Sequence, residues 1–296
     1  MSPARRAALF VLVASAAFAT ASPLARWARP ADPIFVAFAR CVLGALVLAA
    51  VDVRAVARDL GRATGRQRLL VACVGALLAL HFALFLVGLD RTSLAAAISL
   101  VSLEPLSVVL FAWGMHRIAP TRLELVGVLT ATAGACLVAR AAGRGEHRLE
   151  GDLLVIGAVV VYGLYVASAR SLRAALPARS YAVSVYVAAA FTLMLVLPFA
   201  PRASSGWSLP PHSWIAIAAL ALVPTAIGHT MVQTGSRTLS PSTVALVSPG
   251  ETIGGMVISV LLMGARPLPL EIAGAAVVLV GATLAIFGAR PIVQSS

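Results

Sequence analysis

Residues 94–127 read LAAAISLVSLEPLSVVLFAWGMHRIAPTRLELVG, and this stretch decides how the rest of the sequence is interpreted. It is long and apolar enough to cross a membrane, yet it carries Glu104 near its middle, followed at once by Pro105. A similar stretch returns 147 residues later as VALVSPGETIGGMVISVLLMGARPLPLEIAG, with Glu251 in place of Glu104. The same offset relates four further pairs of identical residues: Pro120 and Pro267, Glu124 and Glu271, Gly127 and Gly274, Gly134 and Gly281. The chain therefore contains one helix–turn–helix unit twice.

The composition places the chain among integral membrane proteins. Of its 296 residues, 60% are hydrophobic and 11% are charged, against about 25% charged residues in a typical soluble domain. A membrane-spanning helix needs roughly 20 consecutive apolar residues, and we predict an all-α membrane protein with ten of them. The predicted spans are 7–25, 33–51, 69–89, 93–114, 123–140, 153–169, 181–199, 213–234, 242–264 and 270–288.

Several other classes of protein are disfavoured. The formal charge is +12, but every basic residue is arginine and nearly all lie in short loops between apolar segments, as loops at a membrane surface do. We therefore expect no nucleic-acid partner. The sequence lacks the Walker A, HExxH and GxSxG motifs, which would indicate ATP binding, a zinc protease and a serine hydrolase. The three cysteines lie in apolar segments without metal-site spacing. We predict no enzyme activity, cofactor, catalytic residue or metal ligand.

The arrangement of the spans predicts inverted repeats. Residues 1–142 and 151–290 form two five-span repeats, joined by a polar linker at 143–150. Because five is an odd number, the second repeat enters the membrane in the opposite sense, which is a signature of transporters that alternate access to a midplane site. Fourteen arginines fall on one side and eight on the other, so the positive-inside rule places both termini in the cytoplasm. The first span can also be interpreted as a signal peptide, but its counterpart in the sixth span favours a retained helix.

The two intramembrane acids are the main candidates for function. A charged group in a bilayer normally faces a partner or a water-filled cavity, and helix interruptions at matching positions point to a transporter binding site. Pro105 interrupts the first repeat, and Ser248, Pro249 and Gly250 precede Glu251 in the second. We predict that both acids line a central cavity, with Ser102 within reach. The alternative is that each acid only caps the backbone that its proline leaves open.

Other polar residues inside the spans join this candidate site. Arg40 either neutralises an acid or a substrate carboxylate, or extends to the interface. His81 either titrates or binds substrate, or it bonds to a neighbouring helix. His229 and Gln233 continue a polar face that begins at Thr225, and this face is expected to line the cavity. Tyr162 either bounds the substrate or packs within the protein.

The chain resembles a known family. Ten spans in two halves, the SLEP element at 102–105 and a basic turn leading to a Gly-x6-Gly helix are similar to the EamA-type transporters of the drug/metabolite transporter superfamily. Glu104–Pro105 matches the family's acid–proline pair, and Glu251 occupies the corresponding place in the ninth span. The sequence departs from the pattern at Pro249–Gly250 and Thr252, and its first span lacks the tryptophan that is often found there.

The resemblance implies a secondary-active transporter in the bacterial inner membrane that exports small amphipathic metabolites such as amino acids. Its expected partners are a small-molecule substrate and the lipid bilayer, with the chain as a monomer or homodimer. Two alternatives stay open. One is a transporter of phosphorylated or nucleotide-linked sugars, which would require several cavity cations, and the other is a membrane sensor or assembly subunit that transports nothing.

Overall fold

The computed structural model describes residues 3–117, 119–168, 172, 175–200, 208–228, 231 and 247–288. The regular elements in these residues are helices. In the first half they are α1 (Pro3–Ala19), α2 (Ala21–Trp27), α3 (Pro33–Val51), α4 (Val53–Gly61), α5 (Gly65–Arg91), α6 (Leu94–Val101), α7 (Glu104–His116) and α8 (Arg122–Ala139). In the second half they are α9 (Leu149–Ser168), α11 (Ala178–Val196), η1 (Leu197–Phe199), α12 (Pro211–Leu220), η3 (Ala221–Gly228), α15 (Val247–Met263) and α16 (Pro269–Gly288).

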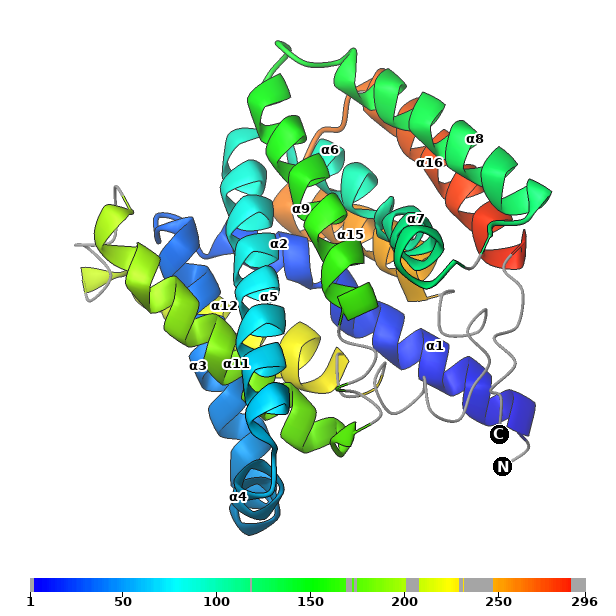
Figure 1. Ribbon diagram of the computed structural model, residues 1–296. Helices are drawn as coiled ribbons and strands as arrows, with labels where there is room; N and C mark the ends of the chain where they lie inside the picture. The colour runs from blue at the N-terminus through cyan, green and yellow to red at the C-terminus, as the bar shows by residue number, and fades with distance from the viewer. Residues whose placement is uncertain are drawn as a thin grey trace.

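Helices from the two halves pack against one another throughout the bundle. The helix α8 packs along α16, α5 along α9, α11 along α3 and α5, and α1 along α15. Figure 1 shows α8 and α16 as a pair on one side of the molecule, with α3, α5 and α11 on the other. The short helix α7 packs against α9. The chain therefore forms one intertwined bundle, because each half provides partners for the other.

Eight helical segments among the described residues are long and apolar enough to cross a membrane, and three of them combine consecutive elements: α6 with α7, α11 with η1, and α12 with η3. They correspond to eight of the ten predicted spans. The first predicted span, 7–25, is divided between α1 and α2, and in the ninth the described helix α15 has 17 residues. The chain is thus a multi-pass membrane protein, and the total of ten spans stays a prediction.

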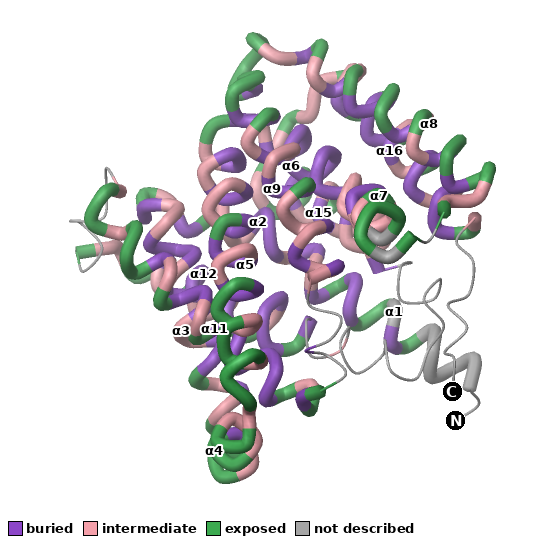
Figure 2. Tube along the Cα trace, in the orientation of Figure 1, coloured by how far each residue is buried: buried purple, intermediate pink, exposed green. Residues whose placement is uncertain are grey.

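The outer surface of the bundle is apolar. Large hydrophobic side chains such as Leu129, Leu262 and Phe287 are at least 65% exposed, and Figure 2 shows the exposed positions along the outer faces of the helices. A soluble protein rarely exposes apolar surface of this extent. Hydrocarbon chains of the bilayer are the medium in which such a surface is stable.

The glycines repeated in the sequence hold α8 against α16. A Cβ atom built at Gly134 would lie 2.6 Å from the backbone nitrogen of Val278 and 2.8 Å from the carbonyl oxygen of Gly274. Gly127, Gly274 and Gly281 lie equally close to the opposite backbone. Small residues allow helices to approach this closely in a membrane, where packing contributes much of the association energy. These glycines therefore join α8 and α16, which correspond to the fifth and tenth predicted spans.

Candidate transport site

The break between α6 and α7 places Glu104 inside the bundle. α6 ends at Val101, the Leu103 N–H donates to the Leu100 carbonyl at 3.1 Å, and Glu104 is the first residue of α7. Pro105 then occupies the second position of the new helix, where its missing N–H has no intrahelical partner to lose. The Glu104 side chain is 18% exposed. The proline therefore begins a helix at this point, and the acid stands at the N-terminus of that helix.

His81 faces this acid from α5. Its Nε2 lies 3.8 Å from Glu104 Oε1, and its Nδ1 lies 3.0 Å from the carbonyl oxygen of Ala158 on α9. Because a carbonyl oxygen only accepts hydrogen bonds, Nδ1 must carry a hydrogen. The neutral ring would then present an unprotonated Nε2 toward Glu104. The two side chains therefore lie at ion-pair distance, with the Nε2 lone pair directed toward the acid.

Aromatic rings surround His81. Its ring centroid lies 5.2 Å from that of Tyr162, 5.3 Å from Phe82 and 6.3 Å from Phe85, and the Phe85 ring is nearly parallel to it. Tyr162 in turn lies 6.0 Å from Tyr165. These contacts hold the imidazole in one orientation. The aromatic rings make its surroundings apolar, and the tyrosines add hydroxyl groups.

Arg40 is buried against the ring of Phe82. It is 3% exposed, its guanidinium carbon lies 4.2 Å from the centre of the Phe82 ring, and its Nε and Nη2 atoms donate to Thr225 Oγ1 at 3.2 and 2.9 Å. The Thr225 hydroxyl donates to the Leu220 carbonyl at 2.7 Å, so its lone pairs are directed to the arginine. The side chain therefore does not extend to the interface. A cation lies in the core of the protein, held between a ring face and a hydroxyl.

The second acid belongs to the same electrostatic environment. Glu251 lies on α15, within electrostatic range of Glu104 and of Arg40. Pro249 and Gly250 lie in the first turn of α15, which is helical through both of them. A Cβ atom at Gly250 would meet the side chain of Ser15 on α1, so this glycine permits close packing. The partly buried Ser248 accepts a hydrogen bond from Thr252 Oγ1 through its carbonyl oxygen at 3.1 Å.

The remaining predicted residues differ in where they lie. Ser102 is buried, and its hydroxyl donates to the Ser99 carbonyl at 2.6 Å, so it bonds to its own helix end. His229 and Gln233 lie outside the described residues. Thr225, which the sequence placed with them on a polar face, bonds to Arg40. In the part of the chain that the structure describes, no group of three or more His, Cys, Asp or Glu side chains is arranged to hold a metal ion.

The structure thus joins His81, Glu104, Tyr162 and Arg40 through a chain of contacts across α3, α5, α7 and α9. Sequence reasoning missed the residues that connect them, Phe82 and the carbonyl of Ala158. Phe82 carries no polar signal, and a backbone carbonyl has no signature in a sequence. Arg40 and Thr225 belong to different repeats, so their hydrogen bond cannot be inferred from the sequence without the fold.

Comparison with known proteins agrees with this architecture. Residues 5–140 and 149–287 each match the EamA-like transporter family. The chain belongs to that family. A search of curated proteins found no match. One solved crystal structure superposes with a TM-score of 0.67 at 20% sequence identity, over 95% of this chain and 97% of the other. At that identity the likeness establishes the fold alone, whereas the family match makes this EamA-family chain a membrane transporter.

Proposed function

We propose that this EamA-family protein is a secondary-active exporter of small amphipathic metabolites, amino acids above all, and that it works by alternating access. The observation that carries the proposal is the placement of opposite charges in one apolar core. Glu104 stands at a helix break opposite His81, and Arg40 is buried against the ring of Phe82, which also contacts His81. Ionisable groups inside a membrane protein mark substrate and proton pathways.

The arrangement of charges suits a zwitterion. Glu104, with Glu251 in electrostatic range, provides the negative side that a substrate ammonium group would contact. Arg40 provides a guanidinium, whose planar geometry suits a carboxylate. Phe82 and Tyr162 pack against the His81 ring, and they are the aromatic side chains that a substrate side chain would contact. A phosphorylated or nucleotide-linked sugar would require more positive charge than Arg40 supplies within this cluster.

The same residues can couple export to a proton gradient. A proton on Glu104 neutralises the acid, so a cationic substrate amine and a proton compete for the same carboxylate. His81 is fixed by Ala158 with Nε2 toward Glu104 and can accept the displaced proton. In an inverted-repeat protein such a site opens to each side in turn. We place the protein in the bacterial inner membrane, with both termini in the cytoplasm.

Flux measurements test this proposal directly. The purified protein is reconstituted into liposomes, and counterflow of radiolabelled amino acids is measured with and without a proton gradient. We expect Glu104→Gln to abolish flux because the amide cannot exchange a proton or bind an ammonium group as an ion pair. The control is Glu150→Gln, which removes an exposed acid that is paired with Arg91 at the surface.

Two results would reject the proposal. Full flux in Glu104→Gln would assign the acid a structural role at the start of α7. Absence of flux for every amino acid tested, with a folded wild-type protein, would favour the sensor or assembly subunit. Flux of a sugar phosphate instead would replace the substrate class and leave alternating access in place.

A further inference from the structure

The short helix α4 lies at the end of the bundle where α3 ends and α5 begins (Figure 1). Asp52 ends α3 with a non-helical backbone, and its Oδ1 accepts from the Ala55 N–H at 2.9 Å, so a new helix begins there. Val56 is 5% exposed and belongs to the main hydrophobic core, and Leu60 packs against that core. One face of α4 is therefore fixed to the bundle, mainly against α11.

Five arginines in and after α4 are exposed. They are Arg54, Arg58, Arg62, Arg66 and Arg68. All eleven acidic residues of the chain lie within the described ranges, and none of them forms an ion pair with these arginines there. The two acids of this segment have other partners, because Asp52 caps α4 and Asp59 accepts from Ser180 Oγ at 2.5 Å. With five arginines and two aspartates, residues 52–68 carry a formal charge of +3.

The arginines are arranged as a row and not as a scattered set. Arg54, Arg58 and Arg62 follow one another at intervals of four residues, which places them along one side of a helix, away from Val56 and Leu60. The other two arginines lie in the first turn of α5, where positive charge opposes the helix dipole. Helix stability therefore does not explain why arginines stand at these positions.

The row lies beside apolar side chains that are also exposed. Val51 at the end of α3 is 64% exposed, Val53 at the start of α4 is 62% exposed, and Leu69 in α5 is 67% exposed. Both α3 and α5 are long and apolar enough to cross a membrane, so α4 lies where two spans leave the hydrocarbon. Charged and apolar surface thus meet at the depth of the lipid headgroups.

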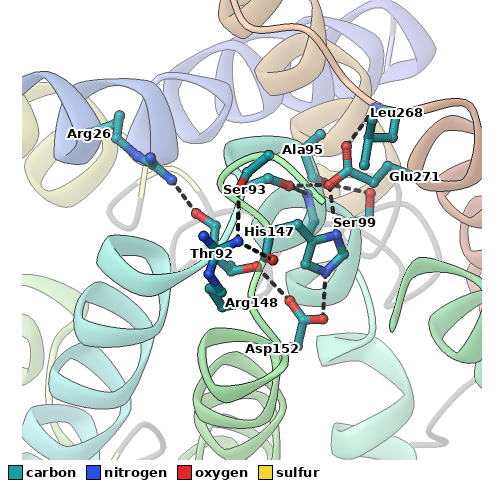
Figure 3. A network of polar contacts seen from close by, with 12 residues as sticks. Arg26, Thr92, Ser93, Ala95, Ser99, His147, Arg148, Asp152, Leu268 and Glu271 are labelled. Atoms are coloured by element: carbon teal, nitrogen blue, oxygen red, sulfur yellow. Dashed lines mark hydrogen bonds and ion pairs between the residues drawn. The ribbon is translucent and has the colours of Figure 1, made fainter. Parts of the chain in front are cut away.

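The arginines at the other end of α5 have partners within the protein. Arg26 donates to the Thr92 carbonyl at 2.6 Å and pairs with Glu146 at 2.9 Å. The other pairs at that end are Arg29 with Asp90, Arg91 with Glu150, and the buried His147 with both Asp152 and Glu271. Figure 3 shows Arg26 and His147 in this network. The chain therefore places acids beside its arginines at one end and leaves them without acids at the other.

We propose that α4 and the first turn of α5 form a binding surface for an anionic phospholipid. The phosphate contacts the row from Arg54 to Arg62, because guanidinium groups bind phosphate oxygens in pairs, and the acyl chains lie against Val51, Val53 and Leu69. Basic segments next to a membrane span attract anionic lipids in this way. A free phosphate would use only the charges, whereas a lipid uses the apolar surface as well. In the predicted orientation this surface faces the cytoplasm.

Native mass spectrometry of the full chain in a neutral detergent measures this binding. The protein is titrated with phosphatidylglycerol or with phosphatidylcholine of the same acyl chains, and the dissociation constant of the first bound lipid is determined. We expect phosphatidylglycerol to bind at least tenfold more tightly. Each basic residue near an anionic lipid surface strengthens binding by about fivefold, so Arg54→Gln/Arg58→Gln should weaken phosphatidylglycerol binding by about tenfold or more and leave phosphatidylcholine binding unchanged.

The matched control removes two arginines from the opposite end of the bundle. Arg140 and Arg144 are exposed, and neither forms an ion pair with a residue that the structure describes. Arg140→Gln/Arg144→Gln lowers the net charge by the same amount, and it should bind phosphatidylglycerol as the parent does. If the first double variant does not fold, Arg58→Gln alone provides the test, with an expected loss of about fivefold.

A second measurement locates the lipid. A photoreactive phosphatidylglycerol in phosphatidylcholine vesicles is cross-linked to the reconstituted protein, and the labelled peptides are identified. We expect labelling within residues 51–69, reduced in Arg54→Gln/Arg58→Gln and unaffected by excess inorganic phosphate.

Four outcomes would overturn the proposal. Equal affinity for the two lipids would leave the arginines with the role of orienting the chain in the membrane. Equal losses in the two double variants would show that only the net charge matters. Displacement of the lipid by inorganic phosphate would indicate a site for a free anion, and labelling confined to other segments would place the lipid elsewhere. Neither measurement requires flux, so these outcomes are independent of the proposed function.

Discussion

The bond between Arg40 and Thr225 allows a sharp test of how the buried cation is stabilised. Thr225→Val removes the hydroxyl and keeps the shape of the side chain, including the methyl group that packs beside Gly44. The substitution leaves no cavity, so its effect reports hydrogen bonding. It takes away the acceptor that both Arg40 Nε and Arg40 Nη2 use.

The magnitude follows from the contacts. A hydrogen bond to a charged group contributes about 1.5–3 kcal/mol, and a buried group that loses its partner bears the full desolvation penalty. Both arginine nitrogens share one oxygen, so we count the pair as one strong interaction of about 2–3 kcal/mol. Because 1.4 kcal/mol is a factor of ten, the unfolding equilibrium constant should rise roughly 30- to 140-fold. Thr225→Ser keeps the oxygen and should lose less than half of this free energy.

The assay is reversible unfolding in mixed micelles, with increasing fractions of a denaturing detergent and tryptophan fluorescence as the signal. The control is Thr132→Val on α8, an exposed residue whose hydroxyl donates only to the carbonyl of its own helix. Equal stability of the two valine variants would show that Thr225 does not stabilise Arg40, and the buried cation would then depend on Phe82 and Glu251.

Two further outcomes are expected. Gly134→Ala should lower the free energy of unfolding by about 1–3 kcal/mol, because its Cβ would lie 2.6 Å from the Val278 nitrogen. The control Gly114→Ala should leave this free energy unchanged, because a Cβ there meets no atom within 4 Å. Equal midpoints of the two variants in the same unfolding assay would contradict the close packing of α8 and α16. Cysteines at Ala119 and Ala265, which lie in equivalent turns of the two repeats, should react with an impermeant maleimide from opposite faces of the membrane, and reaction from one face would refute the inverted arrangement.

The fold was largely predictable because the membrane restricts what a chain can do. A segment in lipid must satisfy its own backbone, so apolar length predicts helices, and most of the expected spans agree with the structure. The glycine pairs were predictable from the 147-residue offset, since small residues at a fixed spacing indicate close contact. The division of the first span at Thr20 was not predicted, although Pro23 in the first turn of α2 lacks the N–H that would bond to the carbonyl of Ala19, where α1 ends.

The site was only partly predictable from the sequence. An acid followed by proline in an apolar segment marked Glu104, and a histidine in a span marked His81, because both residue types are rare in lipid. The sequence allowed two interpretations of Arg40, a buried cation or a side chain that extends to the interface. The distance of Arg40 from the end of its span did not decide between them. His147 was missed because polar loops usually lie in solvent. The available signal was Asp152 five residues later, but Glu271 is distant in sequence and only the fold brings it to the ring.

The two repeats agree in their packing residues and differ at their ends. Glu124 and Glu271 cap equivalent helices through the same kind of backbone bond. Of these two acids only Glu271, among the described residues, also meets a histidine, His147, whose other ring nitrogen contacts Asp152. Through these contacts α16 is tied to the linker and to α9, whereas the contacts recorded for the Glu124 side chain among the described residues stay at the start of α8.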